Sequence, residues 1–132
     1  MAVGRLLPDT CAWIDFFRGK QNSLANALEQ ALISGEVLTC GVVLLELLQG
    51  IKSPREEALV KNALLALPHL EMNRDLWIKA GKLSSTLRAK GHIVPLADII
   101  IATFALEHNC AVLTIDRHFE AVDGLTVLNE PT

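Results

Sequence analysis

The sequence contains no long hydrophobic run, no regular cysteine pattern and no excess of basic residues. The longest apolar stretch, residues 93–106, has 14 residues and includes an aspartate, so it is too short to span a bilayer and indicates a buried helix. The three cysteines are scattered, which gives no zinc-ligand spacing and is typical of a reducing cytoplasm. The N-terminal segment shows no cleavage-site pattern for secretion. We therefore expect a cytoplasmic protein that has no membrane contact.

Net charge does not decide whether the chain binds nucleic acid. The sequence has 15 Asp and Glu residues against 12 Lys and Arg, a net charge of -3. Setting aside the four acids described below leaves 11 acids against those 12 basic residues, so the remaining surface is nearly balanced. A length of 132 residues, of which 51% are hydrophobic, predicts one globular domain over residues 1–132.

Short apolar strands alternate with helical segments along the chain. Helical spacing and capping signals predict helices over residues 10–17, 22–34, 42–49, 54–67, 75–90 and 95–108. Strands are predicted over residues 5–7, 36–39, 70–72, 111–114 and 125–128. This alternation predicts an α/β fold whose parallel sheet is covered by helices on both faces.

Four acidic residues lie inside or directly after apolar segments, where an unpaired carboxylate is heavily penalised. They are Asp9 after 6–8, Glu46 within 42–48, Asp98 within 94–101, and Asp116 after 112–115. Asp9 and Asp116 each follow a predicted strand, and open parallel α/β folds bind ligands at the carboxyl ends of their strands. No basic residue lies in any of the four runs. We therefore expect one shared site that holds a divalent cation such as Mg²⁺ or Mn²⁺, ions that prefer carboxylate oxygens.

Some of these residues also have a simpler explanation than the shared site. Asp9 can cap the helix that follows it, and Asp98 can occupy the first turn of its own helix. Glu46 has no capping role, because it lies in the middle of a leucine-rich helix. The hydroxyl of Thr114 either orients a ligand or a water or caps the local backbone. A cation held by these acids would activate water and polarise a phosphoryl oxygen, which is the chemistry of phosphodiester cleavage.

Four segments resemble, in order and spacing, the successive motifs of PIN domains, and those of VapC-type toxins of toxin–antitoxin pairs in particular. They are Leu7–Thr10, Leu45–Gly50, Leu96–Ala102 and Leu113–Phe119. The resemblance implies a three-layer α/β/α fold with a mostly parallel central sheet, and a Mg²⁺- or Mn²⁺-dependent endoribonuclease. By the same resemblance, the metal-binding catalytic acids are Asp9, Glu46, Asp98 and Asp116. Thr114 falls where the family often keeps a polar residue, and some members carry a further acid where this chain has His118.

The resemblance also implies partners. RNA would be the substrate, and a VapB-type antitoxin would be the inhibitor. We expect apolar residues of the antitoxin in a groove between helices 10–17 and 22–34, and an arginine of the antitoxin at the acids. The helices over residues 53–67 and 75–90 carry more apolar residues than one small sheet can cover, which predicts a homodimer. The apolar residues in question include Leu59, Leu64, Leu65 and Trp77.

Three other functions were compared with this interpretation. A phosphatase of the haloacid dehalogenase type needs a second aspartate two residues after the first, where this chain has Cys11. A phosphoryl-acceptor receiver domain needs paired acids after the first strand and a lysine after a late strand, and the corresponding segments contain neither. A PIN-like domain that only binds a partner would have no need of its acids, and all four are present here.

Overall fold

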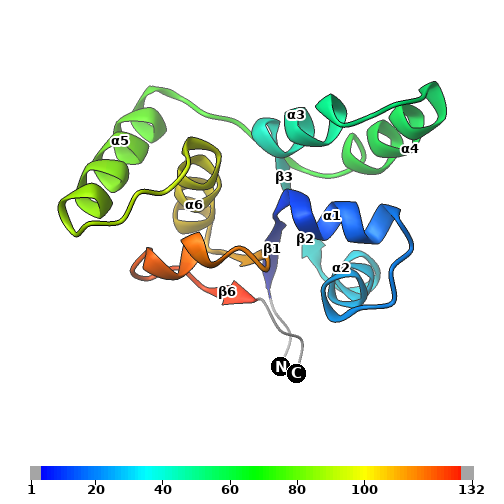
Figure 1. Ribbon diagram of the computed structural model, residues 1–132, viewed down its shortest axis with the longest axis horizontal. Helices are drawn as coiled ribbons and strands as arrows, with labels where there is room; N and C mark the ends of the chain where they lie inside the picture. Colours follow the sequence, from blue (N-terminus) through cyan, green and yellow to red (C-terminus); the bar gives the residue numbers. More distant parts are fainter. Residues whose placement is uncertain (1–3, 129–132) are drawn as a thin grey trace.

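A computed structural model of the chain describes residues 4–128 (Figure 1). Its central sheet has four parallel strands in the order β2-β1-β5-β6. The strands are β1 (Arg5–Pro8), β2 (Glu36–Val37), β5 (Cys110–Leu113) and β6 (Val127–Leu128). Pro8 lies opposite Leu113, so β1 and β5 end level with each other. This register confirms the predicted parallel sheet and places the residues that follow these two strands side by side.

One predicted strand, over residues 36–39, is divided between two sheets. Leu38 still donates its amide to Leu6 of β1 at 2.9 Å, but Thr39 donates to Pro68 at 3.0 Å. The chain has therefore left the central sheet, and β3 (Thr39–Cys40) pairs in parallel with β4 (His69–Leu70). The prediction of one continuous strand was wrong because the change of partner depends on residues that are distant in sequence.

The helices enclose the central sheet from both sides. They are α1 (Thr10–Phe17), α2 (Ser23–Ser34), α3 (Gly41–Gln49), α4 (Pro54–Leu64), α5 (Arg74–Ala89) and α6 (Leu96–His108), with a 3₁₀ helix η1 (Arg117–Ala121). Helices α1 and α2 lie on one side of the strands, while α6, with α5 outside it, lies on the other (Figure 1). Helices α3 and α4 pack together beside α1. This arrangement agrees with the predicted three layers.

Local capping explains why most helices begin where the sequence predicts. Asn22 accepts a hydrogen bond from the amide of Ala25, and Asn73 accepts one from that of Leu76, each at 2.9 Å. Ser53 caps α4 by accepting from the amide of Glu56 at 3.2 Å. Helix α4 ends at Leu64, before the predicted end at residue 67. Among residues 4–128, no helix is both long enough and apolar enough to cross a membrane.

The hydrophobic core lies between the sheet and its helices. Trp13 of α1, Phe104 of α6 and Phe119 of η1 are among its largest fully buried side chains. The ring of Trp13 stacks on that of Phe17, with centroids 5.7 Å apart. Because it is buried, Trp13 serves the core and is not available to stack on a nucleotide base. These buried side chains anchor α1, α6 and η1, the three elements whose first residues lie near the carboxyl ends of the central strands.

Candidate active site

Asp9 and Thr114 lie next to each other at the ends of the two central strands. The amide of Asp9 donates to the carbonyl of Leu113 at 2.9 Å, which continues the pairing of β1 and β5 by one residue. The carboxylate of Asp9 caps α1 by accepting from the amide of Thr10 at 2.8 Å. Asp9 is only 7% exposed, so its remaining oxygen needs another partner.

Thr114 supplies that partner and connects two of the predicted acids. Its fully buried hydroxyl donates to Oδ2 of Asp9 at 2.8 Å and accepts from the amide of Asp116 at 2.9 Å. The hydroxyl group therefore fixes the carboxylate of Asp9 and the backbone that carries Asp116 at the same time. Both interpretations of Thr114 made from the sequence, local capping and orientation of a functional group, are compatible with this geometry.

Glu46 reaches the same region from helix α3. The hydroxyl of Thr10, in the first turn of α1, donates to Oε1 of Glu46 at 2.6 Å. Glu46 is half-buried, and its position in the middle of the helix gives it no role as a cap. Thr10 therefore lies between Asp9 and Glu46, with its amide on the first carboxylate and its hydroxyl on the second.

Asp98 and Asp116 meet at a third residue, His118. Asp98 lies in the first turn of α6 and is 8% exposed, while Asp116 caps η1 by accepting from the amide of His118 at 2.9 Å. Nδ1 of His118 lies 3.1 Å from Oδ2 of Asp98 and 2.7 Å from Oδ1 of Asp116. One ligand atom from each of these three residues lies within 4.8 Å of the other two.

The charges of the four acids act on one another. Burial raises the pKa of Asp98 to about 7, and the charges of Asp116 and Asp9 add to this effect. Burial also raises the pKa of Asp9, with smaller contributions from Asp116 and Glu46, although the hydrogen bonds from Thr114 and Thr10 act in the opposite direction. These mutual effects place Asp9, Glu46, Asp98 and Asp116 in one electrostatic cluster.

Asp116 and His118 behave as a pair within this cluster. Burial acts to raise the pKa of Asp116, yet hydrogen bonds from the amide of His118, from Asp98 and from the imidazole hold it below its ordinary value. The hydrogen bond to Asp116 raises the pKa of His118. A carboxylate next to an imidazolium keeps its charge, whereas Asp98, more deeply buried, tends to hold its proton.

The donor groups of this cluster fit a divalent cation. The cluster offers carboxylate oxygens and one imidazole nitrogen, which are ordinary ligands of divalent metals. Within residues 4–128, neither lysine nor arginine forms an ion pair with any of the four acids, and His118 is the basic residue that does. A cluster of interacting carboxylates that lacks a permanent counter-ion is stabilised when a cation binds.

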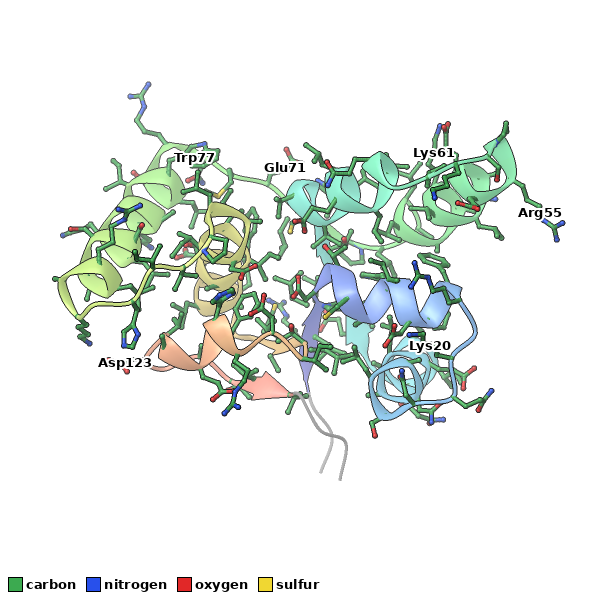
Figure 2. The ribbon with its side chains drawn as sticks, in the orientation of Figure 1. Lys20, Arg55, Lys61, Glu71, Trp77 and Asp123 are labelled. Atoms are coloured by element: carbon green, nitrogen blue, oxygen red, sulfur yellow. The ribbon has the colours of Figure 1, made fainter. Side chains whose placement is uncertain are left out.

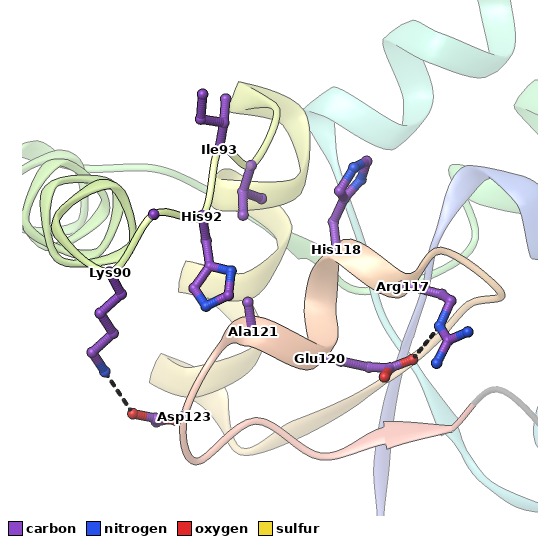
Figure 3. A pocket seen from close by; sticks show the side chains of 10 residues that line it. Lys90, His92, Ile93, Arg117, His118, Glu120, Ala121 and Asp123 are labelled. Carbon is purple, nitrogen blue, oxygen red and sulfur yellow. Dashed lines mark hydrogen bonds and ion pairs between the residues drawn. The ribbon is translucent and has the colours of Figure 1, made fainter.

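A pocket of about 540 Å³ opens beside the cluster and shares His118 with it (Figure 3). Its wall carries two ion pairs, Lys90 with Asp123 at 3.1 Å and Arg117 with Glu120 at 3.3 Å. His92 also lines this pocket, and in the part of the chain that the structure describes it makes no hydrogen bond or ion pair with the four acids. The surface next to the cluster is thus polar, with its charges largely paired.

Two contacts of the site are not evident from the sequence. The bond from Thr10 to Glu46 depends on how α1 packs against α3, which no local pattern reveals. The contacts of His118 with Asp98 and Asp116 depend on how η1 packs against α6. The signal available for His118 was its place two residues after Asp116, inside the turn that Asp116 caps.

Comparisons with known proteins agree on one family. The sequence profile described as "PIN domain" matches residues 6–125. "Ribonuclease VapC11" of Mycobacterium tuberculosis is 26% identical over 128 residues, which cover 93% of this chain and 95% of that protein. A VapC ribonuclease of Mycobacterium bovis matches to the same extent. Both relatives are named as ribonucleases, and both align with almost the whole of this chain.

Solved structures show the same fold. VapBC2 of Rickettsia felis, bound to a DNA fragment from its promoter, aligns with a TM-score of 0.79 and 21% identity, covering 96% of this chain and 99% of that one. VapBC-1 of nontypeable Haemophilus influenzae aligns with a TM-score of 0.78 and 19% identity, covering 95% and 97% of the two chains. VapC20 of Mycobacterium tuberculosis, titled a sarcin–ricin loop cleaving toxin, gives 0.71 and 17%, covering 96% and 99%. At these identities the likeness establishes the architecture of the sheet and helices.

Proposed function

The chain belongs to the PIN domain family, and we propose that it is a metal-dependent endoribonuclease that acts as the toxin of a VapBC-type toxin–antitoxin pair. The observation that carries this proposal is the convergence of Asp9, Glu46, Asp98 and Asp116 at the carboxyl ends of the central strands. The relatives named as VapC ribonucleases support RNA as the substrate. The solved VapBC complexes support an antitoxin as the partner.

The four acids would hold Mg²⁺ or Mn²⁺. A bound divalent cation would lower the pKa of a water molecule and neutralise charge on the phosphodiester. The protein's own residues prepare the site for this chemistry. Thr114 fixes the carboxylate of Asp9, and Thr10 fixes that of Glu46. Both side chains are therefore already in position before substrate arrives. The amide of Asp116 donates a hydrogen bond to the hydroxyl of Thr114, which holds the third carboxylate beside them.

The antitoxin would occupy a pocket that leads to these acids. The groove was predicted between helices 10–17 and 22–34, but α1 and α2 pack closely against each other. A pocket of about 420 Å³ lies instead between α1, α3 and α4, and Glu46 is part of its wall. The apolar part of the wall comes from Ile14, Phe17, Leu47, Ile51, Leu59 and Val60. We place the apolar segment of the antitoxin here, since an arginine on it would then reach Glu46.

A second copy of the chain would cover a different surface. Trp77, Ile78 and Leu96 are 55%, 57% and 73% exposed, and Trp77 projects from α5 (Figure 2). Trp77 and Leu96 line a largely apolar groove of about 610 Å³ between α5 and α6. Helices α4 and α5 lie at opposite ends of the molecule (Figure 1), so one compact contact would cover the apolar residues of only one of them. Leu64, one of those residues, is only 2% exposed and belongs to the core. The homodimer is therefore proposed through α5 and α6.

RNA cleavage in the presence and absence of a divalent cation tests the proposed function. The purified chain should cleave RNA with Mg²⁺ or Mn²⁺ and lose this activity in EDTA. Asp9→Asn should lower the rate by more than about a hundredfold, because the substitution removes a charge that the cation needs. Asp123→Asn makes the same chemical change on an exposed side chain outside the cluster and should leave the rate unchanged. Cleavage that persists in EDTA, or that Asp9→Asn leaves intact, would refute the metal mechanism.

The toxin role needs a separate measurement in cells. Expression of the chain alone should stop growth, and Asp9→Asn should relieve the arrest. Co-expression of a small DNA-binding protein encoded beside this chain should relieve it as well. Normal growth with abundant wild-type protein that cleaves RNA in vitro would remove the toxin role and leave the ribonuclease standing.

A further inference from the structure

His118 occupies an unusual position among the acids. Its side chain is half-exposed, yet its Nδ1 atom lies 2.7 Å from Asp116 and 3.1 Å from Asp98. The neighbouring residues of η1 are used differently, because Arg117 and Glu120 pair with each other at 3.3 Å on the pocket wall. In Figure 3 the imidazole of His118 points away from that pair. Of the side chains of η1, His118 therefore faces the cluster.

The backbone of η1 holds the imidazole in this orientation. Asp116 accepts from the amide of His118 at 2.9 Å, so the residues at both ends of this short turn are fixed relative to each other. Asp116 itself is fixed through its amide, which donates to Thr114 at 2.9 Å. The position of the ring thus follows from the same network that orders the carboxylates.

We propose that His118 is a nitrogen ligand of the cation bound by Asp98 and Asp116, and that it makes the site prefer Mn²⁺ and Co²⁺ to Mg²⁺. This inference rests on the proposed function only in that a divalent cation binds the cluster. The ligand atoms of the three residues lie within 4.8 Å of one another. Two ligands of one small cation lie at most about 4.4 Å apart, given bonds of about 2.0–2.2 Å, so only a slight closure is needed.

The chemistry of the donors gives the direction of the preference. Mg²⁺ binds oxygen almost exclusively, keeps several of its waters and tolerates little departure from octahedral geometry. An imidazole nitrogen is a better ligand for first-row transition metals, whose affinity rises from Mn²⁺ through Co²⁺. A site made of carboxylates alone has no nitrogen ligand that favours transition metals over Mg²⁺. A site made of carboxylates and His118 has one. The residue at position 118 would therefore determine which cation the protein carries.

Pulsed EPR of the wild-type protein loaded with Mn²⁺ tests the ligand directly. Nitrogen bound to Mn²⁺ gives a ¹⁴N coupling, which should change to the ¹⁵N pattern when only the histidines are labelled. The coupling should be absent from His118→Ala and present in His92→Ala. His92 lines the adjacent pocket and is thus the matched control for a histidine close to the site. Because the first spectrum needs no substitution, the test remains valid if a variant fails to fold.

Titration calorimetry at a fixed pH tests the preference. His118→Ala should weaken binding of Mn²⁺ and Co²⁺ by at least about tenfold and change binding of Mg²⁺ much less. His118→Asp should restore tight binding while shifting the preference toward Mg²⁺, because an oxygen then replaces the nitrogen. His92→Ala should bind all three cations like the wild type.

The outcomes separate this inference from the proposed function. Bound Mn²⁺ without a ¹⁴N coupling, or an equal loss of affinity for Mg²⁺ and Mn²⁺ in His118→Ala, would overturn the role of His118 and leave the ribonuclease intact. If neither cation binds the wild type at millimolar concentration, both this inference and the metal-dependent mechanism are wrong. A ¹⁴N coupling that disappears in His118→Ala, together with the selective loss of Mn²⁺, would support it.

Discussion

Asp98→Asn should make the metal-free protein more stable above neutral pH. Asp98 is 8% exposed, and burial raises its pKa to about 7, with further contributions from Asp116 and Asp9. Asparagine has nearly the same shape and cannot ionise. The substitution therefore removes a buried charge that the folded protein holds at a cost when no cation is present.

The magnitude follows from the difference between the folded and unfolded states. An aspartate titrates near 3.9 in an unfolded chain, so a folded pKa of about 7 corresponds to roughly 4 kcal/mol at higher pH. The hydrogen bond from His118, at 3.1 Å in the wild type, already lowers that pKa, so its contribution is part of the same free energy. We therefore expect a net stabilisation of about 4 kcal/mol at pH 8.

The sign of the pH dependence is fixed by the direction of the shift. Because the folded pKa of Asp98 is raised, its stabilising contribution is complete below about pH 4 and is lost as the pH rises through 7. The advantage of Asp98→Asn should therefore grow from pH 5 to pH 7 and become constant above that.

Urea unfolding in EDTA at several pH values measures this difference. Asp123→Asn, at a side chain that is 89% exposed, is the control and should stay within about 0.5 kcal/mol of the wild type throughout. Added Mn²⁺ should stabilise the wild type, because the ion binds only the folded state. It should have little effect on Asp98→Asn, because that variant lacks one of the carboxylates that hold the ion. If Asp98→Asn is less stable than the wild type at pH 8, or if its advantage does not vary with pH, the proposed electrostatic strain at Asp98 is absent.

Three further predictions concern other parts of the structure. Thr114→Val should lower RNA cleavage by about 10- to 100-fold and cost about 1–3 kcal/mol in urea unfolding, because Asp9 and the amide of Asp116 lose their buried partner; wild-type rates would contradict this. Leu59→Asp should weaken antitoxin binding at least about tenfold in calorimetry without reducing cleavage, and unchanged affinity would exclude the pocket between α1, α3 and α4. Trp77→Ser should shift sedimentation from dimer to monomer at micromolar concentration, and a wild-type monomer would exclude the contact through α5 and α6.

The helices could be predicted because their limits depend on nearby residues. Asn22, Ser53 and Asn73 each cap a helix through an amide three residues further on, so the information is local. The break between β2 and β3 could not be predicted in the same way. It follows from the amide of Thr39 donating to the carbonyl of Pro68, and a contact over that distance leaves no trace in the local pattern of residues 36–39.

The acids could be identified because a carboxylate in an apolar run conflicts with the surrounding pattern. The conflict marked Asp9, Glu46, Asp98 and Asp116 without any knowledge of the fold. His118 carries no such mark, since a histidine after a turn is unremarkable in sequence, and its contacts with Asp98 and Asp116 exist only because α6 and η1 pack together. The same limit applies to Leu64, whose burial depends on the orientation of α4.

The proposed antitoxin pocket and the proposed dimer groove lie next to different acids of the cluster. Glu46 is part of the wall of the pocket between α1, α3 and α4, so whatever fills that pocket lies beside one of the four carboxylates. On the opposite side, Leu96 and Ile99 line the groove between α5 and α6, and Asp98 lies between them in sequence, in the first turn of α6. A second copy in that groove would hold the turn that carries Asp98. An antitoxin in the pocket would act directly on the charge of the cluster. Dimer formation and inhibition would therefore act on separate carboxylates of one site, and a dimer can bind an antitoxin on each subunit without the two contacts competing.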